Sequence, residues 1–481
     1  MISTKSRIGL LSASFCGASL ALAAPASAQN KPFPTSGHYA QGFVPPSVTT
    51  AVVQSSYTNW KTKYLLSDCG SGYYRVDNAA GDGSTFSEGQ GYGMVLTAYM
   101  GDQTAFDGLW SFAQKNFDSN KVMGWHVTCS GPTTTDGGAS SATDGDTDIG
   151  FALIVAAAQW GGTYAQQAVT YLEALKKVDF TTCTPSGRNV ATAGDWQSGT
   201  ASSAACTTAG GGSNTSYWMP GYYRVFQALT GDSFWGKTAD DVVTLYGLAA
   251  NSTTGIIVNE VDQDGVAVSG QTYDYNSCRI PWRAVLDYLW FGTPGAQQAT
   301  TKLSSWVNTV PIAKIVDGYD ANGTPSGQYT GMNPFVGGFT AGAMSDSQAL
   351  VDSFATDFVA IADDNGSYYG SSLRTLYLLE LSGNQWNPLE SLADGGVVQG
   401  IDGGFATSPD AGMSGTKGSG HADGGTVSTT GTSNADGGAS NEDTDGSKSG
   451  GGCRMVPGAE PAAGFAVVAV MLGLGLRRRR R

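Results

Sequence analysis

Histidine, basic residues and enzyme fingerprints are scarce in this 481-residue chain, and each shortage excludes a class of protein. There are three histidines and no Gly-x-Ser-x-Gly turn, so a Ser/His/Asp hydrolase is not expected. No phosphate-binding loop or dinucleotide fingerprint occurs, and we expect no cofactor. Lysine and arginine number 26 against 40 acidic residues, and this net charge of −14 argues against nucleic acids and anionic membranes as partners.

The first residues carry a targeting pattern. Lys5 and Arg7 precede an apolar run that ends before the small residues Ala-Ser-Ala at 26–28. This order is typical of a secretory signal peptide. We therefore expect residues 1–28 to be removed and the rest of the chain to be exported.

The last residues also carry a targeting pattern. Fifteen mostly apolar residues at 462–476 precede five arginines. The run is shorter than the roughly 20 residues that span a bilayer. With Cys453 ahead of it, the segment 453–481 resembles the C-terminal sorting tails of myxobacterial surface proteins. That resemblance implies cell-surface sorting machinery as a partner, and a plain tail-anchor helix is the alternative.

Residues 389–452 have the composition of a linker. They are rich in Gly, Ser, Thr and Asp, and the sequence Ala-Asp-Gly-Gly occurs in them three times, at 393–396, 422–425 and 435–438. Because they offer little apolar surface to bury, a flexible stalk is predicted. Nine acids and two lysines give the stalk half of the chain's net charge, so much of that charge serves solvation.

Residues 29–388 are expected to form one folded domain. In an exported protein its five cysteines can form disulfides. Spacing alone does not fix their connectivity. The pairs that we expect are Cys183 with Cys206, which bracket one polar loop, and Cys69 with Cys129, which leaves Cys278 unpaired.

Apolar residues recur at helical spacing throughout this domain. Twelve helices are predicted, near 48–66, 90–101, 103–117, 146–160, 164–178, 218–229, 233–250, 281–291, 295–309, 333–344, 346–361 and 370–382. Tight glycine turns join the members of several pairs, which predicts antiparallel neighbours. The long connections at 119–145, 180–216, 251–280 and 311–332 are expected to build a cleft. The predicted fold class is all-α, with six helical hairpins that can close into a double ring.

The most informative segment runs from Ala142 to Trp160. It places Asp144, Asp146 and Asp148 on alternate positions where an apolar helix begins. Another acid, Glu88, stands where a second helix begins. Acids at helix starts with aromatics nearby suggest carbohydrate chemistry, because sugars present hydroxyls to carboxylates and C–H faces to rings.

This segment resembles the signature of glycoside hydrolase family 8, with Gly150 where the family usually has Ala. Other motifs resemble the same family in its order, namely Ser87-Glu88-Gly89-Gln90-Gly91-Tyr92-Gly93-Met94, Met123-Gly124-Trp125, Gly194-Asp195-Trp196, Ser216-Tyr217-Trp218, Arg279-Ile280-Pro281-Trp282-Arg283 and Tyr368-Tyr369-Gly370. The resemblance implies an (α/α)6 barrel, which agrees with the twelve helices. It also implies an inverting enzyme for β-1,4-glucan, mixed-linkage glucan, xylan or chitosan.

By this resemblance Glu88 is the proton donor, and Asp144 hydrogen-bonds and distorts the sugar at the cleavage point. Inversion needs a carboxylic acid and, roughly 6.5–9.5 Å away, a carboxylate that activates water. A donor must keep its proton near neutral pH, so we expect Asp144 close to Glu88, where it raises the donor's pKa. Asp146 and Asp148 are expected to cap their helix, the alternative being a metal site, which the family does not need.

The general base is the open question. Many family members have Asp where this chain has Asn276, and an amide cannot accept the water's proton. Some branches share the Asn and supply the base from the preceding long loop. Residues 251–280 contain one glutamate, Glu260, which we predict as the base, with Asp274 and Asp262 as alternatives. A calcium loop around these acids is not expected, because its final glutamate is replaced by Gln271.

Aromatic residues of the matched motifs are expected to line the cleft. Their rings would stack on pyranose faces, and tyrosine hydroxyls would bond sugar hydroxyls. Arg279 would hydrogen-bond a sugar or hold a carboxylate. For each lone aromatic, core packing is the alternative. The predicted substrate-binding residues are Trp125, Trp196, Tyr217, Tyr275, Arg279, Tyr368 and Tyr369.

The sequence thus predicts a secreted or cell-surface, monomeric endo-glycosidase for a β-1,4-linked polysaccharide, with β-glucan or cellulose first. Chitosan is the nearest rival substrate, since the Asn276 pattern occurs in branches active on chitosan, and xylan is next. A non-catalytic carbohydrate-binding protein is the hypothesis from another class, supported by the missing aspartate.

Overall fold

A computed structural model describes residues 31, 33–35, 39–362 and 367–393 of this protein. The predicted signal peptide, the stalk beyond residue 393 and the C-terminal tail lie outside the described residues. Among the described helices, none has the length and apolarity to cross a bilayer.

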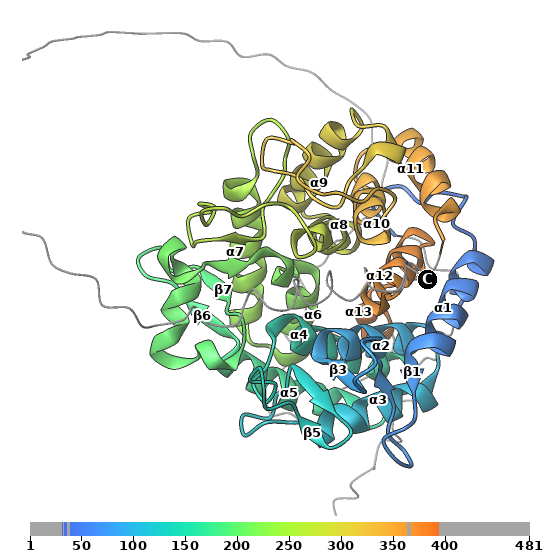
Figure 1. Ribbon diagram of the computed structural model, residues 1–481, viewed down its shortest axis with the longest axis vertical. Coiled ribbons are helices and arrows are strands. Elements are labelled where there is room, and N and C mark those ends of the chain that lie inside the picture. The colour runs from blue at the N-terminus through green and yellow to red at the C-terminus, as the bar shows by residue number, and fades with distance from the viewer. Residues whose placement is uncertain (1–30, 32, 36–38, 363–366, 394–481) are drawn as a thin grey trace, which may run out of the picture. The chain divides into compact units, whose positions relative to one another are not determined.

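Twelve helices of the described part form an inner and an outer ring (Figure 1). The inner ring consists of α2 (Ser87–Tyr99), α4 (Thr143–Trp160), α6 (Pro220–Thr230), α8 (Ile280–Phe291), α10 (Asn333–Ala343) and α12 (Tyr368–Leu381). The outer ring consists of α1 (Thr50–Tyr64), α3 (Gln103–Lys115), α5 (Tyr164–Val178), α7 (Ser233–Ala249), α9 (Pro294–Val307) and α11 (Gln348–Ala360). Each inner helix packs on the next, and α12 packs on α2, so the ring closes. The predicted (α/α)6 barrel of six hairpins is confirmed.

The two rings differ in how their helices are buried. All of α12 is buried, and so is every residue of α4 except Trp160 and every residue of α2 except Glu88. Outer helices such as α3 and α5 bury one stripe. A helix that is apolar on all sides belongs inside, whereas an amphipathic one covers it. Glu88 is therefore the one position of α2 that this packing leaves partly open.

All twelve predicted helices are present, but the two that carry the acidic motifs begin earlier than predicted. Helix α2 begins at Ser87 rather than at 90, and α4 begins at Thr143 rather than at 146. A further helix, α13 (Pro388–Ala393), crosses the boundary predicted for the stalk, because Leu389 and Leu392 pack against the core.

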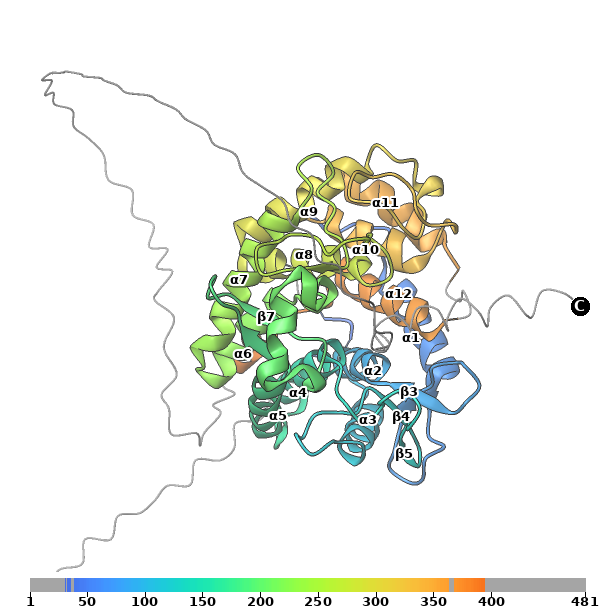
Figure 2. The same ribbon diagram turned by 60° about the vertical axis from the view of Figure 1, so that its left-hand side comes forward.

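The long connections contain short strands and turns of 3₁₀ helix. The strands are β1 (Leu65–Leu66), β2 (Arg75–Val76), β3 (Ser84–Phe86), β4 (His126–Thr128), β5 (Gly131–Pro132), β6 (Phe180–Thr182), β7 (Asn189–Ala191), β8 (Ser213–Asn214) and β9 (Glu260–Val261). The 3₁₀ turns are η1 (Asp195–Gln197), η2 (Gly199–Cys206), η3 (Thr208–Gly210), η4 (Thr215–Tyr217), η5 (Ser277–Arg279) and η6 (Ile312–Lys314). Strands β3, β4 and β5 form one antiparallel sheet beside α2 (Figure 2), whereas β8 pairs with β9 and so joins two of the long connections.

Both expected disulfides are present. Cys69 bonds to Cys129, and Cys183 bonds to Cys206. Cys278 is free and buried.

Glycines let the first turns of α2 and α4 come into backbone contact. A Cβ at Gly91 would lie 2.8 Å from both Asp148 Cβ and the Gly145 carbonyl oxygen. A Cβ at Gly145 would lie 2.7 Å from the Glu88 backbone nitrogen. Because backbone atoms cannot move aside cheaply, these two glycines fix the separation of the helices that carry Glu88 and Asp144.

We expect Gly91→Ala to lower the free energy of unfolding by about 1–3 kcal/mol, because the added methyl overpacks a buried helix contact. The matched control is Gly247→Ala on α7, where an added Cβ meets no atom within 4 Å. That change should be neutral or stabilise by about 0.4–1 kcal/mol. Urea unfolding of both variants measures the difference, and equal stabilities would contradict the close contact.

Candidate active site

Glu88 enters the site from the first turn of α2. Strand β3 runs directly into this helix, and the Ser87 amide donates to the Trp125 carbonyl at 2.9 Å, which anchors the junction. The side chain of Glu88 is 19% exposed. The carboxyl group is therefore accessible from one side and enclosed on the others.

The three acids at the start of α4 have three different surroundings. Asp144 lies in the first turn, beside Arg279. Asp146 accepts hydrogen bonds from the Met123 amide at 2.9 Å and from the Tyr171 hydroxyl. The residue before the helix, Ala142, supplies no side-chain cap.

The prediction that Asp146 and Asp148 cap this helix is wrong. Because α4 begins three residues earlier than predicted, both carboxylates lie inside it and point at neighbouring elements. Asp148 forms an ion pair with Arg283 at 2.7 Å.

Arg279 joins the acids of α2 and α4. Its Nη1 lies 2.8 Å from Glu88 Oε2 and 2.7 Å from Asp144 Oδ2, and it donates to the Tyr92 hydroxyl at 3.0 Å. Its Nη2 donates to Ser216 Oγ at 2.7 Å. The guanidinium is 2% exposed, so the two carboxylates share one buried cation. The structure thus brings Glu88, Asp144 and Arg279 together.

The Glu88 carboxyl group has a raised pKa of about 7. Burial is the largest cause, and the charges of Asp144 and Asp148 add to it. Arg279 and the hydrogen bond from the Tyr368 hydroxyl, 2.9 Å from Glu88 Oε1, act in the opposite direction. A carboxyl group with this pKa holds a proton in a large fraction of molecules at neutral pH, which a general acid requires.

Glu260 lies on β9, opposite Asn214 of β8. Burial first, and then the charge of Asp274, raise the pKa of its carboxyl group to about 7. The Tyr217 hydroxyl lies within electrostatic reach of Glu260 as well as of Glu88 and Asp144. The pairing of β9 with β8 also places Glu260 opposite Asn214, two residues before Ser216, which binds Arg279.

The alternative bases have structural partners. Asp274 accepts hydrogen bonds from Asn259 Nδ2 at 2.6 Å and from Thr272 Oγ1 at 3.0 Å. Asp262 accepts backbone amides within its own turn. The Asn276 side-chain oxygen accepts a hydrogen bond from Arg279 Nη2 at 3.3 Å. Both carboxylate oxygens of Asp274 thus accept hydrogen bonds, whereas Asp262 accepts both of its turn amides at Oδ1.

The predicted aromatic residues fall into two groups. Trp196 is 52% exposed, while Trp125, Tyr217 and Tyr275 are half-buried. Trp125 stacks on Phe86, with ring centroids 5.6 Å apart. These rings have faces or edges that a sugar could contact.

Tyr368 and Tyr369 form the other group, since both are buried. Tyr368 donates to Glu88, and Tyr369 donates to the Tyr275 carbonyl. The Arg279 guanidinium lies 5.8 Å from the centre of the Tyr369 ring. In this structure both tyrosines hold charged groups of the site rather than offering open faces.

Several contributing residues were not predicted from the sequence. Tyr92 and Ser216 bind Arg279, and Asp317 accepts a hydrogen bond from the Tyr275 hydroxyl at 2.9 Å. Helical spacing could have indicated Tyr92, which follows Glu88 by four residues. Ser216 lies in the matched motif Ser216-Tyr217-Trp218, but its contact with Arg279 was not predicted. No sequence signal indicated Asp317, which belongs to another long connection.

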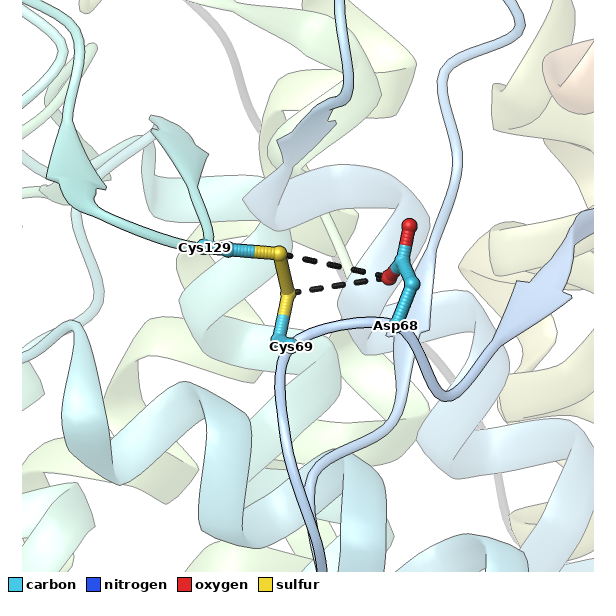
Figure 3. A group of neighbouring side chains, drawn as sticks. All are labelled: Asp68, Cys69 and Cys129. Atoms are coloured by element: carbon cyan, nitrogen blue, oxygen red, sulfur yellow. Dashed lines mark hydrogen bonds between the residues drawn. A yellow bond between two sulfur atoms is a disulfide. The ribbon is translucent and has the colours of Figure 1, made fainter.

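Within the described ranges, one group of potential metal ligands is close enough to share an ion, namely Asp68, Cys69 and Cys129. Figure 3 shows that the two cysteines are joined in the disulfide, so neither offers a thiolate. The Asp68 oxygen Oδ1 lies 3.7 Å from Cys69 Sγ, and the carboxylate pairs with Arg75. We therefore interpret this group as a disulfide beside an ion pair, with a structural role, and not as a metal site.

Comparison with known proteins agrees with this geometry. Residues 31–383 match the model of glycosyl hydrolases family 8. The chain is 32% identical to endoglucanase A of Acetivibrio thermocellus over 72% of each protein, and 32% identical to a beta-glucanase of Niallia circulans over 77% of this chain and 93% of that one. The apo structure of a beta-1,3-1,4-glucanase from Paenibacillus sp. X4 superimposes with a TM-score of 0.65 at 30% identity, covering 76% of this chain and all of that one. This chain therefore belongs to glycosyl hydrolase family 8, and it is an inverting glycoside hydrolase.

Proposed function

We propose that the protein is an exported endo-β-1,4-glucanase in which Glu88 is the general acid, Glu260 is the general base and Asp144 binds the sugar at the cleavage point. The observation that carries the proposal is that Arg279 joins Glu88 to Asp144. The pairing of β8 with β9 connects Glu260 to the segment whose Ser216 also binds Arg279. Glu88 and Glu260 both have a pKa of about 7, while Arg279 holds Glu88 and Asp144 in place.

Each of these three residues has its own role in the hydrolysis. Glu88 gives its proton to the glycosidic oxygen as the bond to the anomeric carbon breaks. Glu260 accepts a proton from a water that attacks that carbon from the opposite face, which inverts its configuration. Arg279 Nη1 lies 2.7 Å from Asp144 Oδ2 and holds this side chain where it can accept a hydrogen bond from a sugar hydroxyl.

The substrate and location are also part of the proposal. Relatives named endoglucanase and beta-glucanase favour a β-glucan. Chitosan is the second candidate. Asn276 stands where many family members have an aspartate as the general base, and Glu260 can take that role in this chain. The patterns of residues 1–28 and 453–481 favour a monomer that is secreted or held at the cell surface, with sorting machinery acting on the tail.

The test is to incubate the mature chain with barley β-glucan, carboxymethyl-cellulose, chitosan and xylan. We expect new reducing ends fastest from a β-glucan, and NMR should show the α-anomer first, because inversion of a β-linkage produces it. Early β-anomer would contradict the proposed mechanism, and faster release from chitosan would replace the substrate. A protein that binds these polymers and releases no sugar would support the binding-protein hypothesis.

A further inference from the structure

Helix α2, helix α4 and the continuous segment η5–α8 each place two polar side chains four residues apart. Residues four apart on a helix lie on the same face, one above the other. The pairs form two tiers, an upper tier of Glu88, Asp144 and Arg279 and a lower tier of Tyr92, Asp148 and Arg283. The upper tier is the site described above, and the Asp148–Arg283 pair of the lower tier has no assigned role in the mechanism so far.

The lower tier contains a fully buried ion pair. Asp148 and Arg283 lie 2.7 Å apart, with side chains 0% and 1% exposed. The Arg283 guanidinium also lies 3.7 Å from the centre of the Trp282 ring. Burying two charges costs several kcal/mol of desolvation for each ion, so a buried pair is weak evidence of a role in stability. Its position points to another role.

Asp148 lies directly against α2. Its Cβ is within 2.8 Å of where a Cβ on Gly91 would stand, and Gly91 follows Glu88 by three residues. The absent side chain at Gly91 therefore allows a carboxylate to lie one turn below the acid of α2. Inside a protein, a fixed negative charge near a carboxyl group favours the neutral form of that group.

We propose that the Asp148–Arg283 pair is a positioning element for catalysis, in which Asp148 holds a negative charge one turn below Glu88 and thereby favours the protonated, proton-donating form of that glutamate. The inference rests on the proposed role of Glu88 as general acid. Arg283 has a separate part, because its charge and its hydrogen bond oppose the rise that burial gives the pKa of Asp148.

Asp144 also places a negative charge beside Glu88, so the charge of Asp148 adds to that of Asp144. The titratable groups that face Glu88 besides Asp148 are Arg279, Asp144, Tyr92, Tyr217, Cys278, Tyr368 and Tyr369. Those that face Asp148 and Arg283 from the neighbouring helices are Tyr92, Tyr222, Tyr223, Tyr246, Tyr377 and Glu380. Burial raises the pKa of every one of these phenols and of Cys278, so they are neutral near pH 7, and it raises the pKa of Glu380 as well.

The test is Asp148→Asn in the full chain, followed by two measurements. The basic limb of the kcat/KM profile reports the acid and the acidic limb reports the base. We expect the basic limb to move to lower pH, because Glu88 loses its proton more easily, while the acidic limb stays. The second measurement is NMR titration of ¹³C-carboxyl-labelled glutamate. The chain has seven glutamates, and Glu88→Gln identifies the signal of Glu88.

The NMR titration needs no substrate, so it separates this inference from the proposed function. If the wild type cleaves none of the polymers, the function fails, yet the Glu88 midpoint in Asp148→Asn still decides the role of Asp148. An unchanged midpoint would overturn the inference, and a lower one would support it.

Two further variants exclude indirect effects. Asp148→Asn leaves Arg283 unpaired, so Asp148→Asn/Arg283→Met removes both charges, and the midpoint should still fall, though by less. The matched control is Asp146→Asn, two residues away on α4 and equally buried. Burial raises the pKa of Asp146 to about 8, so this acid is mostly neutral at pH 7 and its replacement should leave the Glu88 midpoint in place. A shift of equal size in the control would show a general disturbance of α4 and overturn the inference.

Discussion

We expect Glu88→Gln to lower kcat/KM on a soluble β-glucan by about 10²–10⁴-fold, with binding of the polymer retained. The amide keeps the size of the side chain and can still contact Arg279 and Tyr368, but it has no acidic proton to give. The loss should therefore fall on kcat rather than on affinity. Reducing-end assays and isothermal titration with a β-glucan oligosaccharide measure the two separately.

The leaving group supplies the decisive comparison for this variant. An aryl glycoside with a good leaving group, such as a 2,4-dinitrophenyl cello-oligosaccharide, departs without protonation. It should therefore lose far less rate in Glu88→Gln than the polymer does. The matched control is Glu173→Gln, an exposed position on α5, which should behave like the wild type. Equal losses on both substrates would contradict the role of Glu88 as acid.

The helices could be predicted from the sequence because burial in this fold follows local periodicity. The starts of α2 and α4 could not be predicted as well, since strand β3 and the Trp125 carbonyl, both outside the helical pattern, support the first turn of α2. That difference of three residues decided the roles of Asp146 and Asp148. With a helix start at 146, Asp146 and Asp148 are predicted to be capping residues. Inside the helix that begins at Thr143, they contact Tyr171 and Arg283 instead.

The site shows the same division between local and long-range information. The motifs singled out Glu88, Asp144 and Arg279, and the structure brings these residues together. The contacts of Ser216, although it lies in a matched motif, and of Asp317 could not be predicted, because they depend on how long connections fold over the barrel. The pairing of β8 with β9 is of this kind as well, and it is this pairing that fixes where Glu260 lies.

The second large effect is expected for Glu260→Ala, which should lower kcat by about 10²–10⁴-fold on the polymer and on the activated aryl glycoside alike. Both substrates need the attacking water to lose a proton, so a better leaving group should not rescue this variant. The variants Asp274→Asn and Asp262→Asn should lose much less, because their carboxylates accept hydrogen bonds from Asn259 and from turn amides.

Sodium azide distinguishes a missing base from a damaged site. Azide is already an anion, so it can attack the anomeric carbon without a base if the space left by the Glu260 side chain admits it. With the activated aryl glycoside we expect azide to restore part of the rate in Glu260→Ala and to give the α-glycosyl azide, since attack comes from the face opposite the leaving group. No such product should form with the wild type. If azide instead restores an Asp274→Ala variant and leaves Glu260→Ala inactive, the base is Asp274 and not Glu260.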